Sequence, residues 1–249
     1  NLYREISEKR CAELLRQSID TVKLFPHTIN IRPTVIVTPT TDDGNADEIL
    51  PRLDFLQNYD QSLVDVDESN AVLGDPQNYY VTYEKEQLTA LREKTQPETP
   101  ATFDDWMIPF ARHTNLDNIK YPVVAVQEFG WSVFRLSSTL GLALASKNNC
   151  DLRMETEVEK IEKSNGGWCI SHSRLSEETT QYTQVDYLIN AGGFETGMVD
   201  DWTQRPKQRF VEFKAAYVTR WEDCDQQWPE VIFHGQRGTP NGMAQLTPY

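Results

Sequence analysis

The chain has 249 residues, enough for one large domain or two, and its six Trp, ten Tyr and ten Phe supply bulk for a core. Its net charge of −14 would repel phosphate backbones and anionic lipids, so we expect no nucleic-acid partner. No apolar run approaches the roughly 20 residues that span a bilayer, so we expect no membrane span.

Helical and extended patterns alternate through the first half of the chain. Apolar residues at helical spacing predict a helix over residues 2–25, which Pro26 ends. The remaining elements expected in this half are a strand at 29–38, a helix at 48–58, a strand at 79–83, a helix at 84–94, a short helix at 104–113 and a strand at 121–126. Two prolines within 95–102 indicate a linker.

The second half of the chain predicts one long helix and then a three-strand meander. Leu136, Leu140 and their neighbours form one apolar face of a helix at 132–146. Strands are expected at 152–161, 168–173 and 182–190, separated by polar turns. Further strand-like stretches are 210–221, 231–235 and 242–249.

The end of the third meander strand has a distinctive composition. The apolar run of Tyr187, Leu188 and Ile189 suits a buried strand, and Asn190-Ala191-Gly192-Gly193 follows it. Two glycines let a backbone approach a flat or charged group closely, and ligands of open α/β sheets lie beyond the carboxyl ends of strands. A tight turn after a buried strand explains the same residues equally well.

This order of elements resembles the flavoprotein oxidoreductases of the D-amino acid oxidase and glycine oxidase superfamily. Residues 188–193 are similar to that family's strand that re-enters the FAD domain, and Glu128-Phe129-Gly130-Trp131 with the helix after it resembles the helix before the meander. The similarity is best over 127–249, whereas residues 1–126 match only through a leading helix and strand. Trp131 is most simply a packing residue at the helix start.

The resemblance implies FAD as the cofactor and an amine or amino acid as the substrate. The cofactor-binding positions that it implies are Ala191, Gly192, Gly193, Gly242, Met243, Ala244, Gln245 and Leu246. It also implies that Arg237 pairs with a substrate carboxylate, that Tyr217 lies over the substrate, and that His234 makes a polar contact near the flavin. An exposed loop arginine, a core tyrosine and an ordinary hairpin loop over 234–243 are the competing interpretations. No catalytic side chain is assigned.

Several features bound this hypothesis. The family's Gly-x-Gly-x-x-Gly loop, which binds the pyrophosphate, does not occur in the sequence. We therefore expect the chain to be a piece of a longer flavoprotein, with FAD binding by this piece alone left open. The four cysteines are widely spaced, which suits a reducing compartment and a cytoplasmic location, and the four scattered histidines suggest no metal site.

These observations together predict a mixed α/β (α+β) fold. Residues 1–126 are expected to form helices and strands of a substrate domain, 127–197 the helix, meander and Ala-Gly-Gly strand of the FAD-side domain, and 198–249 substrate-domain strands that return toward FAD. The function expected is oxidation of an amine or amino acid by hydride transfer to flavin. Alternatives are a non-enzymatic acidic α/β binding or interaction domain and a pyridine-nucleotide-linked flavin reductase. The sequence leaves the oligomeric state open.

Overall fold

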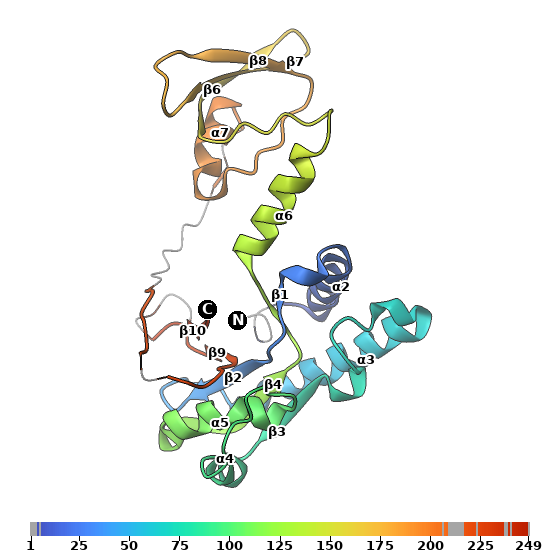
Figure 1. Ribbon diagram of the computed structural model, residues 1–249, viewed down its shortest axis with the longest axis vertical. Helices are drawn as coiled ribbons and strands as arrows, with labels where there is room; N and C mark the ends of the chain where they lie inside the picture. The colour runs from blue at the N-terminus through green and yellow to red at the C-terminus, as the bar shows by residue number, and fades with distance from the viewer. Residues whose placement is uncertain are drawn as a thin grey trace. The chain divides into compact units, whose positions relative to one another are not determined.

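The computed structural model describes residues 4, 6–205, 207–208, 217–222, 224–236, 239 and 241–248. The chain divides into two compact units, one made of Asn1–Leu140 with Glu222–Tyr249 and the other of Gly141–Trp221 (Figure 1). The linker expected at 95–102 lies inside the first unit, where it joins two helices and separates no domains. Among the described residues, no helix combines the length and apolar character needed to cross a bilayer.

A five-stranded mixed sheet organises the first unit. Its strands run in the order β10-β9-β2-β4-β3. Strand β2 pairs in parallel with β9 and antiparallel with β4, and the β3–β4 and β9–β10 pairs are antiparallel. The strands are β2 (Thr34–Pro39), β3 (Tyr80–Tyr83), β4 (Ile119–Val126), β9 (Glu230–Phe233) and β10 (Ala244–Leu246), and a separate pair joins β1 (Ile29–Asn30) to β5 (Gly130–Trp131).

Helices cover both faces of this sheet. Val35 and Val37 pack in one core with α4 (Lys85–Leu91) and α5 (Phe103–His113). Ile36, which lies between those valines, packs in a second core with α2 (Glu8–Leu24) and α3 (Leu50–Val66). Alternate side chains of a strand point to opposite faces, so burial on both faces explains the continuous apolar runs Val35–Val37 within β2 and Val123–Val126 within β4. In Figure 1, α4 and α5 lie together, away from α2.

The caps that begin the helices follow from the sequence. The Ser7 hydroxyl accepts a hydrogen bond from the Arg10 amide at the start of α2, and Thr102 and Asp105 form a reciprocal capping box at the start of α5. Helix α3 runs to Val66, well beyond the predicted end at residue 58. Short 3₁₀ turns are η1 (Pro26–Thr28), η2 (Ala46–Ile49), η3 (Glu68–Asn70), η4 (Pro76–Asn78) and η5 (Leu116–Asn118).

The second unit contains the predicted meander. Its strands β6 (Thr156–Ser164), β7 (Gly167–Arg174) and β8 (Gln181–Val185) pair antiparallel in that order, and η6 (Gly193–Glu195) and α7 (Thr196–Trp202) follow. Helix α6 (Val133–Ala145), which contains the division between the units, confirms the helix expected at 132–146. No residue of α6 is buried, so the apolar face predicted for it has no covering layer in the described structure.

The fold class predicted from the sequence, mixed α/β, is confirmed. The third meander strand ends at Val185, five residues before its predicted end. Tyr187 and Ile189 are about nine-tenths exposed, so a buried strand over Tyr187–Ile189 is wrong. An apolar run forms a buried strand only where a neighbouring strand and a covering layer exist, and the described part of this unit supplies neither. The strand expected at 210–221 lies mostly outside the described residues, and Tyr217–Trp221 are not extended in a sheet.

Candidate functional site

The segment after β8 forms a turn that the Asn190 side chain organises. Its amide oxygen accepts a hydrogen bond from the Gly192 amide at 3.2 Å, and its amide nitrogen donates to the Thr196 carbonyl at 3.0 Å and to the Asp200 carboxylate at 3.1 Å. One side chain therefore joins the chain before the glycines to the first turns of α7. The residues between are fixed by this network and not by strand pairing.

The backbone of this turn is uncovered. Ala191, Gly192 and Gly193 are all exposed, and a Cβ added to Gly193 would meet no atom within 4 Å. Gly193 has a φ of +57°, a conformation that glycine adopts at little cost. A Cβ at Gly192 would lie 3.3 Å from the Asn190 amide oxygen. Both glycines are exposed, but only at Gly193 is the space beside the backbone empty.

The other predicted cofactor residues lie in the first unit, on the β9–β10 hairpin. Ala244, Gln245 and Leu246 form the exposed edge strand β10, and Gly242 and Met243 precede it. Two backbones approach closely in this hairpin, because a Cβ on Gly235 would lie 2.1 Å from the Asn241 carbonyl oxygen. The glycine at 235 is therefore explained by hairpin geometry alone.

The predicted substrate residues occupy very different surroundings. Arg237 lies outside the described residues. Tyr217 belongs to the second unit and is 86% exposed, so the interpretation of it as a core tyrosine is wrong. His234 belongs to the first unit and is 3% exposed, directly after β9. His234 and Tyr217 thus lie in separate units, each with its own surroundings.

His234 lies near the carboxyl ends of the parallel strands β2 and β9. Its amide donates to the Val37 carbonyl at 2.7 Å, and its Nδ1 has no hydrogen-bond partner in the described part of the chain. Burial, with a further contribution from nearby Arg4, lowers the pKa of His234 to about 4. The ring is therefore neutral at pH 7. A buried, neutral histidine is poorly placed to contact a substrate from solvent.

An ion pair accompanies this histidine at the same strand ends. An Arg4 guanidinium nitrogen lies 2.7 Å from an Asp42 carboxylate oxygen. Burial by itself would raise the pKa of Asp42, but hydrogen bonds from Arg4 and from the Gly44 amide outweigh it and lower that pKa. Lys120 donates to the carbonyl oxygens of Asp42 and Gly44 at 2.6 and 2.7 Å. These contacts join Arg4 and Lys120 to the loop after β2 and hold that loop in place, which is a structural role.

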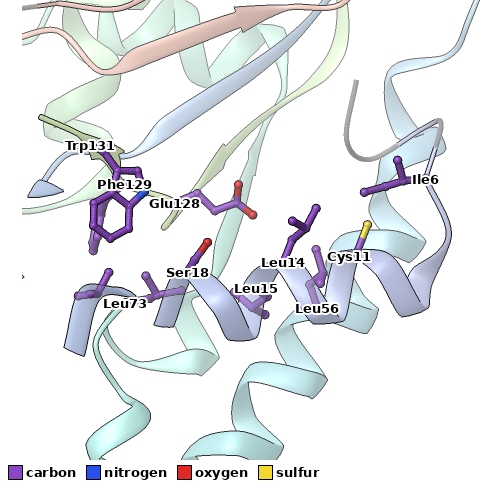
Figure 2. Close-up of a pocket in the computed structure, with 11 residues that line it drawn as sticks. Ile6, Cys11, Leu14, Leu15, Ser18, Leu56, Leu73, Glu128, Phe129 and Trp131 are labelled. Atoms are coloured by element: carbon purple, nitrogen blue, oxygen red, sulfur yellow. The ribbon is translucent and has the colours of Figure 1, made fainter. Parts of the chain in front are cut away.

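A pocket that the sequence did not reveal lies between α2, α3 and the segment after β4 (Figure 2). Glu128 and Trp131, which the sequence presented only as part of a helix start, line it together with residues of both helices. Its volume is about 130 Å³. No motif could have marked it, because its lining comes from four separated parts of the chain. Among the described residues, no cluster of His, Cys, Asp and Glu could hold a metal ion.

The flavin ring that the resemblance implies can be tested against these surroundings. A planar ring needs backbone without covering side chains, and Ala191, Gly192 and Gly193 meet that requirement. The pyrophosphate of FAD needs a glycine-rich loop before a helix, and the sequence has no such loop. The residues present therefore fit the ring and not the dinucleotide tail. No protein-family model matches this chain, and no curated protein matches it at a significant level.

Proposed function

We propose that this chain is part of a flavin-dependent oxidoreductase that acts on an amine or amino acid. The observation that carries the proposal is the uncovered backbone at Gly192 and Gly193, directly after a three-strand antiparallel meander. The preceding helix α6 and the β9–β10 hairpin follow the order of elements in the family that the sequence resembles. The same proposal includes a cytoplasmic location.

Each group of residues has a defined part in this proposal. When bound, FAD would supply the acceptor for a hydride from the carbon that bears the amine. The backbone of Ala191, Gly192 and Gly193 would lie against the ring, held in place by Asn190. The small residues at 191–193 have no long side chain that would clash with a planar ligand. The proposed ring contact lies wholly in the second unit, whereas the roles of Gly242–Leu246 as a flavin contact and of Arg237 as the partner of a substrate carboxylate are those that the resemblance implies.

A flavin titration tests the proposal with a matched pair of variants. Gly193 and Gly166 both have positive φ, at +57° and +88°, and a Cβ at either would meet no atom within 4 Å. Gly166 lies in the β6–β7 turn of the same unit. Alanine therefore imposes a similar backbone strain at both sites, but only at 193 would the methyl group lie against the ring. Quenching of FAD and riboflavin fluorescence measures affinity.

The expected result is flavin binding that Gly193→Ala weakens by about tenfold, equivalent to about 1.4 kcal/mol, and that Gly166→Ala leaves unchanged. Riboflavin should bind about as well as FAD, because the residues present fit the ring and not the pyrophosphate. Equal loss in both variants would show that only backbone strain matters. Absence of any flavin binding by the wild-type chain at 100-micromolar concentration would count against the proposal.

A specific observation favours a second function, that of a non-enzymatic interaction domain. Tyr187, Ile189 and Phe194 are exposed at 90%, 89% and 98% on the surface of the second unit. All three lie within residues 187–194, and an apolar patch on a surface is typical of protein contacts. Under this function, the wild-type chain binds a protein partner but no flavin, and Tyr187→Ser with Ile189→Ser abolishes that association. Flavin binding by the wild-type chain therefore separates the two functions.

A further inference from the structure

The pocket of the first unit is lined mainly by apolar side chains and has the volume of one small ligand. Its volume of about 130 Å³ is close to the roughly 150 Å³ of an apolar cavity that holds benzene. The apolar lining consists mainly of Leu14, Leu15, Val22, Leu56, Leu73 and Phe129. Figure 2 shows Leu14 and Leu15 on α2, and Leu56 comes from α3. The wall suits a single ring or a short hydrocarbon chain.

A carboxylate belongs to this otherwise apolar lining. Glu128, half-buried, lines the pocket together with the Ser18 side chain (Figure 2). One Glu128 oxygen accepts a hydrogen bond from the Tyr79 hydroxyl at 2.8 Å. In the described part of the chain, no Lys, Arg or His forms an ion pair with Glu128. A cationic group that enters the pocket can therefore pair with this carboxylate without displacing another cation.

Tyr79 holds that carboxylate from the buried side. Its side chain is fully buried, and burial together with the neighbouring Glu128 raises the pKa of Tyr79 well above its usual value of 10. The phenol therefore stays neutral and remains a hydrogen-bond donor across the physiological range. It orients one Glu128 oxygen and leaves the charge of the carboxylate uncompensated.

We infer that this pocket binds a small ammonium ion that has a hydrocarbon substituent and carries no carboxylate. The ammonium would pair with Glu128, and the hydrocarbon part would contact the leucine and aromatic wall. An amino acid is disfavoured, because the pocket lining contains no arginine or lysine to receive its carboxylate. The net charge of −14 also favours approach of a cation. This site is formed within the first unit and does not depend on flavin binding.

The test uses benzylammonium as the probe and two ring-matched comparison ligands. Benzyl alcohol keeps the ring and removes the charge, whereas phenylalanine adds a carboxylate. Binding is followed in the full chain, without added flavin, by the NMR signal of the Trp131 indole N–H, assigned with Trp131→Phe. Trp131 lines the pocket, so its signal reports occupancy directly. We expect benzylammonium to bind at least tenfold more tightly than either comparison ligand.

Substitutions of Glu128 and of two residues of α2 complete the test. Glu128→Gln keeps an acceptor for Tyr79 and should weaken benzylammonium binding at least tenfold, without changing the affinity for benzyl alcohol. Asp20→Asn removes one negative charge from the exposed face of α2 and should leave binding unchanged. Ser18→Leu fills the pocket and should abolish binding of all three ligands. Equal binding of benzylammonium and benzyl alcohol, no binding at 10-millimolar concentration, or retained binding in Ser18→Leu would each overturn the inference.

Discussion

The buried carboxyl group of Asp60 makes the stability of the first unit depend on pH. Asp60 lies on α3, is 2% exposed, and its Oδ1 has no hydrogen-bond partner among the described residues. Burial raises the pKa of this group from 3.8 to about 6. Asp60→Asn keeps the shape of the side chain and removes the ionisation, so comparison with wild type isolates the cost of the charge.

The magnitude follows from the size of the shift. Between the unfolded pKa near 4 and the folded pKa near 6, the folded state retains a proton that the unfolded state has released. The contribution of protonated Asp60 to stability is therefore complete below pH 4 and is lost as pH rises through 6. A shift of about two units corresponds to roughly 3 kcal/mol. The free energy of unfolding of Asp60→Asn minus that of wild type should therefore be larger at pH 8 than at pH 4, by up to about 3 kcal/mol.

Urea denaturation between pH 4 and pH 8, followed by amide NMR signals of β2 and β4, measures this difference in the unit that contains Asp60. Asp65→Asn is the matched control, since it removes an exposed carboxylate from the same helix. The reasoning is refuted if the free energies of unfolding of Asp60→Asn and wild type differ by a constant amount across the whole range. Asp65→Asn should keep the wild-type pH dependence.

Three further outcomes are expected from the first unit and from α6. His234 gives stability the opposite pH dependence to Asp60, because its pKa in the folded state is lowered to about 4. Stability is therefore lost as pH falls from 6.5 through 4, by up to about 3 kcal/mol. His234→Gln should remove that loss in the same urea titration. Gly235→Ala should destabilise the protein by about 2–4 kcal/mol, because its Cβ would lie 2.1 Å from a carbonyl oxygen. Gly141→Ala, in open space on a helix, should stabilise the protein by about 0.5–1 kcal/mol. Similar melting temperatures for the two variants would contradict this expectation. Tyr83→Phe should cost about 1 kcal/mol, because the Tyr83 hydroxyl donates to Asp104 at 3.0 Å, and an unchanged urea midpoint would exclude a net contribution from this bond.

Much of the first unit could be predicted from sequence because its strands are buried on both faces. The runs Val35–Val37 and Val123–Val126 contain no charge, and such runs between turn residues predict interior strands. The order of the sheet could not be predicted. One of the two neighbours of β2 is β9, which follows the whole second unit in sequence, and local patterns carry no information on a pairing at that distance.

The candidate site was predictable only in part. The bare backbone at Gly192 and Gly193 follows directly from residue type, and it is open in the structure. The exposure of Tyr187 and Ile189 was not predictable, because an apolar run does not show whether a partner layer exists. The position of Glu128 in the pocket depends on how α2 and α3 pack against the segment after β4, which is a tertiary property.

The place of β9 in the sheet has a consequence for how the protein is made. On the ribosome, β2 and β4 emerge early, but β2 has one unpaired edge until the residues of the second unit and then β9 have been synthesised. At about 5–20 residues per second, that interval after β4 lasts roughly 5–20 seconds. During this time the Val-Ile-Val edge is available to other nascent chains, so translation speed through 141–221 and chaperone capture of that edge should govern the yield of folded protein.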